Sequence, residues 1–234
     1  MRTSLIVAAM LAAIASPASA ASRNFGVSGF TKIRVDGPYK VTVTTGIPPF
    51  AKATGNNAAL DRVAIDVRGD TLVVHPGSGS WGGYPGADAG PVEIAIGVHE
   101  LSNAWVNGAG SLSISRVKGL SFALSVQGAG DAQIDSVDVD QLNVGLVGSA
   151  NAKLSGKTKK LTALVRGIST LIASDLQATD ATVGAEGAAT VDANVTNSVK
   201  VDGTGNATIR FAGRPACTLK VAGSTTVSGC KTTN

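Results

Sequence analysis

The chain has 234 residues, of which 29 are glycine, 15% are charged and only 4% are aromatic. Soluble domains usually contain about 25% charged residues, and the formal net charge of +4 is spread along the chain, so the composition does not favour a nucleic-acid-binding protein. The one basic cluster, at 157–160, lacks interleaved aromatic residues and is interpreted as a solvent-exposed turn. A core has to be built from Val, Ile, Leu and Ala.

Residues 1–20 have the pattern of an export signal. Arg2 supplies a positive charge, an apolar run covers 5–14, and the small residues of 18–20 suit a signal peptidase. The run is shorter than the roughly 20 apolar residues that span a bilayer. We therefore predict a signal peptide at 1–20, export to the periplasm or cell surface, and no transmembrane segment in the mature chain, residues 21–234.

The segment 27–100 alternates apolar and polar residues with period two, which predicts β-strands. It is interrupted by 75–91, which is rich in Gly, Ser and Pro and is typical of a long loop. Trp81 and Tyr84 lie in this loop. They are candidate binding residues, because aromatic rings stack on sugars; alternatively, they cap an end of the fold.

A repeat of about twenty residues covers 101–230, and each copy carries what we call a marker glycine. The aligned glycines are separated by 20, 20, 19, 20, 16 and 20 residues, and they are Gly108, Gly128, Gly148, Gly167, Gly187, Gly203 and Gly223. Apolar residues recur two and four positions before the marker, and four and six positions after it. Such positions share one face of a strand.

These columns predict an all-β, parallel β-helix-like solenoid in which each copy forms one rung. A single rung cannot bury its apolar face, but stacked rungs cover one another. Ile33, Val35, Gly37, Val41 and Val43 match the same offsets, so the entry segment 27–100 is expected to share the core. We predict one domain over 21–234, with regular rungs at 101–230.

A short polar column follows each marker by three residues and is expected to face outward. It consists of Ser111, Asp131, Asn151, Thr170, Thr190, Asn206 and Thr226. Thr170, Thr190 and Asn206 are candidate binding residues for a glycan or another ordered polar surface. In the alternative interpretation, the side chains of the column hydrogen-bond to one another and keep the sheet soluble.

The sequence offers little for catalysis or metal binding. Only His75 and His99 are present, there is no G-x-S-x-G motif, and we predict no cofactor. Clustered aspartates could bind calcium, but neighbouring rungs do not repeat them; they are Asp131, Asp135, Asp138 and Asp140. Glu186 and Asp202 are expected one rung apart, and they are the best carboxylate pair for the alternative of a polysaccharide-degrading enzyme.

The two cysteines of the chain, Cys217 and Cys230, lie near its C-terminal end. In an oxidising compartment they could form a disulfide, whereas a catalytic dithiol would have a tighter spacing such as C-x-x-C. A structural bridge is therefore favoured.

The N-terminal strands and the repeated glycines together resemble the putative auto-transporter adhesin head GIN domain family. The resemblance covers roughly 30–212, and the residues that carry it are Phe30-x-x-Ile33-x-Val35-x-Gly37, Val41-x-Val43-x-x-Gly46, Arg68-Gly69-Asp70-x-Leu72-x-Val74 and the Gly-Ala-Gly of 108–110 and 128–130. The second glycine is replaced at 148–150 and 167–169. The resemblance implies an exported, mostly β protein with a parallel β-helix-like fold, and it implies no reaction.

Together these features predict a non-enzymatic, adhesin-like or glycan-binding protein of the cell envelope. Its partner is then a glycan or another envelope protein rather than a nucleic acid. One alternative is a structural or assembly protein whose strand edges dock another chain by β-augmentation. The other is the polysaccharide-degrading enzyme.

Overall fold

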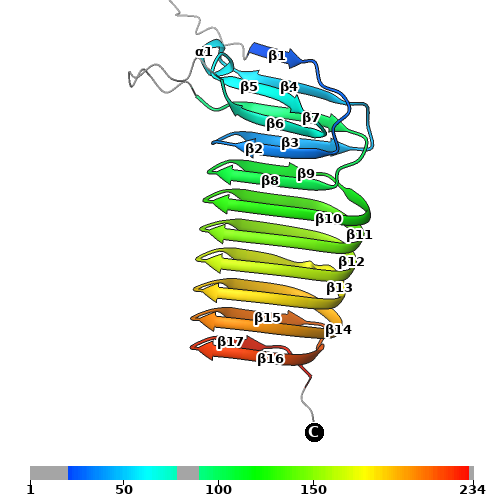
Figure 1. Cartoon of the computed structure of the whole chain (residues 1–234), viewed down its shortest axis with the longest axis vertical. Helices are drawn as coiled ribbons and strands as arrows, with labels where there is room; N and C mark the ends of the chain where they lie inside the picture. The colour runs from blue at the N-terminus through cyan, green and yellow to red at the C-terminus, as the bar shows by residue number, and fades with distance from the viewer. Residues whose placement is uncertain (1–20, 78–89, 232–234) are drawn as a thin grey trace, which may run out of the picture.

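The computed structural model describes residues 21–77 and 90–231 (Figure 1). The expected signal peptide at 1–20 lies outside the described residues, and so do Trp81 and Tyr84. Within the described part of the chain, no helix is long and apolar enough to span a membrane.

The described chain is almost entirely β-structure. Its elements, in chain order, are β1 (Ala21–Phe25), β2 (Lys32–Asp36), β3 (Lys40–Thr45), β4 (Phe50–Gly55), α1 (Asn57–Leu60), β5 (Val63–Arg68), β6 (Thr71–Pro76), β7 (Glu93–Val98), β8 (Asn103–Gly108), β9 (Ser111–Ile114), β10 (Val117–Gly128), β11 (Asp131–Gly148), β12 (Asn151–Gly167), β13 (Thr170–Gly187), β14 (Thr190–Gly205), β15 (Thr208–Ala212), β16 (Ala216–Gly223) and β17 (Thr226–Ser228).

The predicted β-solenoid is confirmed. Successive rungs pair in parallel, and Figure 1 shows them stacked from β2 and β3 down to β16 and β17. Each rung runs along one broad sheet, bends at the marker glycine and returns along a second sheet. Short segments such as 137–139 connect the second sheet to the next rung.

The rungs form two broad sheets, the marker face and the ladder face. The marker face comprises the strands that lead into the bend: β2, β6, β8, β16 and the C-terminal parts of β10 to β14. The ladder face comprises the strands that leave it: β3, β7, β9, β15, β17 and the N-terminal parts of β11 to β14.

The predicted inward columns form the core. In the rungs marked by Gly108 to Gly187 their side chains are at most 5% exposed, and Phe122 is the largest of the fully buried side chains. The backbone at the marker has a positive φ, for example +101° at Gly128, where a Cβ would lie 2.8 Å from the carbonyl oxygen of Gly108. Only glycine tolerates both conditions, which explains the repeat.

The sequence alignment of one rung was wrong, because its marker is Gly205 and not Gly203. The amide of Asn206 donates to the carbonyl of Gly187 (2.8 Å), and Gly187 is paired with Gly205. The true spacings of the last two rungs are therefore 18 and 18 residues, by subtraction. A slip of two residues keeps every side chain on its own face, so burial alone cannot reveal it.

The entry segment shares the core, as expected, and it also caps the solenoid. Gly37 donates to Asn107 in the marker bend, and β2 and β3 stack directly on β8 and β9. At this end the pairing becomes antiparallel: β1 pairs with β4, β4 with β7, and β5 with β6. The helix α1 lies over this end (Figure 1). Arg23 of β1 binds Asp61 just after the helix (2.6 Å).

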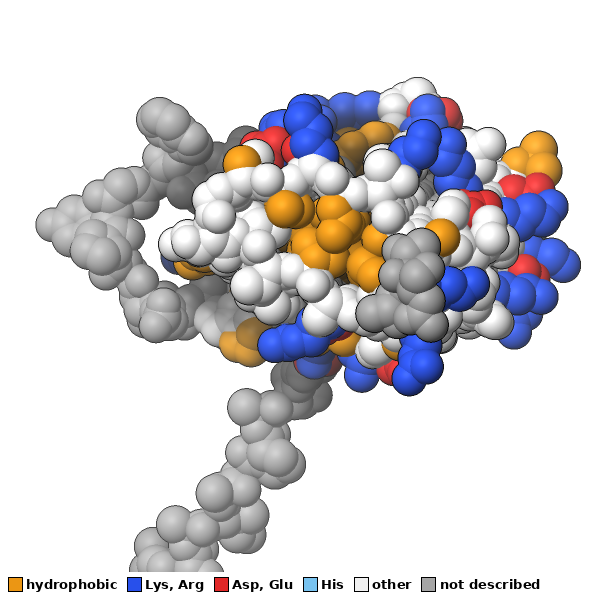
Figure 2. Space-filling model, turned by 90° about the horizontal axis from the view of Figure 1, so that it is seen from below, with side chains coloured by type: hydrophobic (Ala, Val, Ile, Leu, Met, Phe, Trp, Pro, Cys, Tyr) orange, Lys and Arg blue, Asp and Glu red, His pale blue; other side chains and the backbone are white. Residues whose placement is uncertain are grey.

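The C-terminal end has no such cap among the described residues. Leu219 and Val221 occupy inward columns of the last rung, yet each is 47% exposed because no further rung covers them. Figure 2, which views the molecule from this end, shows apolar side chains gathered at its centre.

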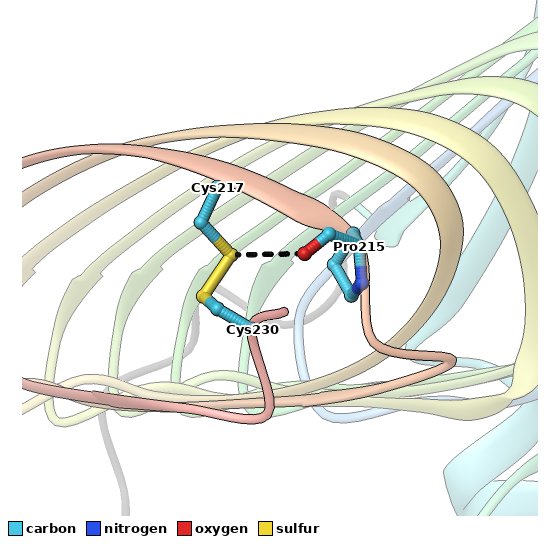
Figure 3. Close-up of a disulfide and its surroundings, with 3 residues drawn as sticks. All are labelled: Pro215, Cys217 and Cys230. Atoms are coloured by element: carbon cyan, nitrogen blue, oxygen red, sulfur yellow. Dashed lines mark hydrogen bonds between the residues drawn. A yellow bond between two sulfur atoms is a disulfide. The ribbon is translucent and has the colours of Figure 1, made fainter. Parts of the chain in front are cut away.

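A disulfide closes this last rung. Cys217 of β16 is bonded to Cys230, with 5.7 Å between their Cα atoms (Figure 3). The Cys217 sulfur also lies 3.6 Å from the carbonyl oxygen of Pro215. This is a polar contact and not a hydrogen bond, because a disulfide sulfur carries no hydrogen to donate.

Candidate functional site

The outward column of the ladder face extends over the whole stack. Thr170 pairs with Asn151 on one side and Thr190 on the other, as the sequence predicted. The next position is Thr208, and Asn206 lies in the bend before it. This correction follows from the true marker, Gly205. The column therefore ends in four threonines: Thr170, Thr190, Thr208 and Thr226.

The two halves of the column differ in how their polar groups are satisfied. Asn151 donates to the carboxylate of Asp131 (3.0 Å), so this pair matches the interpretation that the side chains satisfy one another. Among the described residues, the hydroxyls of Thr170, Thr190 and Thr208 make no hydrogen bond, although their backbone amides do. These hydroxyls remain available to a ligand.

An apolar residue lies beside this threonine column. Ile172 is outward-facing and 40% exposed, two residues after Thr170 on β13. It also lines a hollow of about 320 Å³ that extends along the ladder face toward Asn151 and Lys153. Hydroxyl groups next to an exposed aliphatic side chain offer both kinds of contact that a sugar ring uses.

The carboxylate pair considered for catalysis is not in one column. Because the marker is Gly205, Glu186 pairs with Thr204, and Asp202 pairs with Gly184. Each carboxylate has a cationic partner: Arg166 lies 2.9 Å from Glu186, and Lys220 lies 3.5 Å from Asp202. The two carboxylates do lie on adjacent strands, but they are offset by two residues, so their expected placement in one column was wrong.

The imidazole of His75 is engaged by neighbouring oxygens. Its Nε2 lies 2.8 Å from Asp66 and its Nδ1 lies 2.9 Å from the carbonyl oxygen of Pro76. The hydrogen bond from His75 lowers the pKa of Asp66 below its ordinary value. Nε2 also lies 3.2 Å from the Arg68 guanidinium, so His75 is held between the Asp66 carboxylate and a cation.

His99 lines a second hollow. This hollow of about 680 Å³ lies where the ladder face turns toward β10, and Glu100, Arg116 and Lys118 also line it. Its lining carries charges of both signs and contains no Phe, Tyr or Trp side chain.

The aspartates considered for calcium are each bound to different partners. Asp135 accepts from Gln133 (2.7 Å), whereas Asp138 and Asp140 form ion pairs with Lys157 (3.5 Å) and Lys159 (2.9 Å). Within 21–77 and 90–231, no group of three or more His, Cys, Asp or Glu residues is placed to hold a metal ion.

A family model covers most of the solenoid. The description of this family is "Putative auto-transporter adhesin, head GIN domain", and residues 29–215 match it. The chain belongs to this family. The match includes the entry strands and the marker bends up to Gly205, and it stops before the last rung.

Several solved structures have a similar fold. A putative adhesin from Bacteroides fragilis superposes with a TM-score of 0.79 at 19% identity, over 90% of this chain and 97% of that one. A putative lipid binding protein from Parabacteroides distasonis gives 0.72 at 18% identity, over 90% and 96%. A putative adhesin from Parabacteroides merdae gives 0.67 at 18%, over 90% and 95%. At these identities the likeness shows the fold alone. No curated protein matches the chain significantly.

Proposed function

We propose that this GIN-domain protein is an exported, non-enzymatic, adhesin-like protein of the cell envelope that binds a glycan on its ladder face. The observation that carries the proposal is the column of Thr170, Thr190 and Thr208, whose hydroxyls have no hydrogen-bond partner in the described structure. The family description and the names of two structural neighbours, both putative adhesins, support the adhesin-like part.

The geometry of the column suits an extended polymer better than a small substrate. Strands of a sheet lie about 4.7–4.9 Å apart, so the threonine hydroxyls recur at that interval on a rigid, nearly flat surface. Many weak hydrogen bonds along such a surface sum to useful affinity only when the ligand repeats as well. Ile172 adds an apolar contact at one end of the column.

Binding to insoluble cell-wall polysaccharides, compared between wild type and a triple variant, tests the proposal. Thr170→Val, Thr190→Val and Thr208→Val together remove three hydroxyls while preserving side-chain shape and β-propensity. Because each lost hydrogen bond is worth about 1 kcal/mol, we expect a loss of affinity of at least about tenfold.

The matched control carries the same substitution on the other sheet. Thr162 and Thr182 are outward-facing residues of the marker face, and Thr162→Val with Thr182→Val should leave binding unchanged. Equal binding by the triple variant and wild type would remove the ladder face from consideration. Polysaccharide turnover that Glu186→Gln abolishes would favour the enzyme instead.

A second candidate function is docking of another protein's β-strand at the open C-terminal end. The observation that favours it is the exposure of Leu219 and Val221 beside the strand edge of β16, which has no partner on its outer side in the described structure. An extended strand with apolar side chains would both pair with this edge and cover these residues.

Strand docking predicts a defined partner protein rather than a glycan. Val221→Lys should abolish its capture, because the new charge would have to be buried, whereas Thr218→Lys on the outward side of the same strand should not. Capture that is equal for the two variants and wild type would contradict this candidate.

A further inference from the structure

We propose that the marker face carries a separate sugar-binding site in which Trp105 stacks against a single neutral pyranose ring. Trp105 is the one tryptophan among the described residues, and it is an outward-facing, half-buried residue of β8. It lies on the opposite sheet from the threonine column. The inference rests on the proposed function in one respect, namely that a glycan is the ligand of this protein.

The surroundings of Trp105 leave space for a ligand. A hollow of about 440 Å³ is lined by Arg34, Thr71, Trp105, Asn107 and Gln127. In the column of Trp105, the next rungs carry only Ser125 and then Gly145, and a Cβ on Gly145 would meet nothing closer than 4.0 Å. On the side of β10 and β11 the indole therefore borders an open strip of the sheet, whereas on the other side its direct neighbour is Arg34 of β2.

The polar rim of the hollow is held in place by one carboxylate. Asp36 accepts from Arg34 Nε (2.8 Å) and from Asn107 Nδ2 (2.7 Å). These residues belong to β2 and β8, which are adjacent parallel strands. Their side chains are thus fixed on rigid elements before a ligand binds, which lowers the entropic cost of binding.

Other polar groups of the rim have no partner within the described chain. Neither the Trp105 indole Nε1 nor the Gln127 amide makes a hydrogen bond there, and Asn107 uses only its amide nitrogen. Donors and acceptors that surround an aromatic ring match a pyranose, which has an apolar C–H face and hydroxyls at its edge. A neutral sugar fits best, because Asp36 already balances the charge of Arg34.

The experiment uses tryptophan fluorescence of the full mature chain. The protein has two tryptophans, so Trp81→Phe leaves Trp105 as the only reporter. Titration with a panel of neutral and acidic mono- and disaccharides should change its emission in a saturable way for a neutral member. In the Trp81-containing chain, Trp105→Ala should weaken binding of that sugar at least about tenfold. Gln127→Ala should weaken it less, and Thr182→Ala, on β13 of the same face, should have no effect.

The outcomes separate this inference from the proposed function. If wild type binds cell-wall polysaccharide but no sugar changes the Trp105 signal, the Trp105 site is excluded and the glycan-binding function stands. If Trp105→Ala binds sugar as well as wild type does, the stacking residue lies elsewhere, and Trp81 becomes the candidate. A response to acidic sugars alone overturns the assignment to a neutral ring. If wild type binds neither polysaccharide nor sugar, both proposals fail.

Discussion

Gly148→Ala is expected to lower the free energy of unfolding by about 3 kcal/mol. Two costs contribute. The φ of Gly148 is +102°, and non-glycine residues in such conformations cost about 1–3 kcal/mol. A Cβ there would also lie 2.7 Å from the carbonyl oxygen of Gly128, which is backbone of the neighbouring rung and cannot move aside. Because identical bends lie above and below, the rung has no room to adjust.

The matched control for this prediction is three residues away on the same strand. Gly145 has no positive φ, and its added Cβ would approach nothing closer than the Ser125 hydroxyl at 4.0 Å. Gly145→Ala should therefore be neutral, or stabilise the protein by up to about 1 kcal/mol. Urea denaturation followed by circular dichroism measures both. Equal stability of the two variants would contradict the role assigned to the marker bend.

Removal of the disulfide with Cys217→Ser and Cys230→Ser is expected to destabilise the last rung by about 3 kcal/mol. The bridge closes a segment with a sequence separation of 13 residues, and the restriction of such a loop in the unfolded chain accounts for an effect of this size. The last rung contacts a neighbour on one side only, and its inward residues Leu219 and Val221 are half exposed. The last rung therefore has few packing interactions that could offset the loss of the disulfide.

Hydrogen exchange is the appropriate measurement, because solenoids unfold locally from their ends. Exchange should accelerate in β16 and β17 and remain unchanged in β11 to β13, where each rung is covered on both sides. Reduction of wild type should reproduce the effect, and the double serine variant should not respond to the reductant. Acceleration that extends evenly along the chain would show that the bridge acts globally.

Much of the fold could be predicted from local pattern alone. Period-two alternation places Val144 and Leu146 in the core. The recurring glycine identifies every bend of the repeat except the one at Gly205, because a positive φ and close backbone contact admit no other residue. The match of Gly37 to Gly108 even located the entry rung 71 residues away, by subtraction. These features are local consequences of stacking identical rungs.

The candidate sites depended more on information that the sequence does not contain. Thr170 and Thr190 were predicted in the outward column because successive side chains of a strand alternate between its two faces, and this alternation can be followed along the local sequence. Asn206 was misplaced, because a register shift of two residues leaves every side chain on the same face of the strand. Only the backbone hydrogen bond to Gly187 shows that the marker is Gly205 and not Gly203. Because of the same shift, Glu186 is not paired with Asp202 as predicted.

By itself, therefore, the sequence determined that the chain forms stacked β-rungs, which residues face inward, and where every repeat except the one ending at Gly205 bends, since these depend on neighbouring residues. Only the tertiary structure decided the register of the last rungs, the antiparallel cap and the open C-terminal end. It also brought Asp36 to Asn107 across 71 residues of chain beside Trp105. Contacts between rungs join residues whose separation varies from one turn to the next, and no local rule predicts that variation.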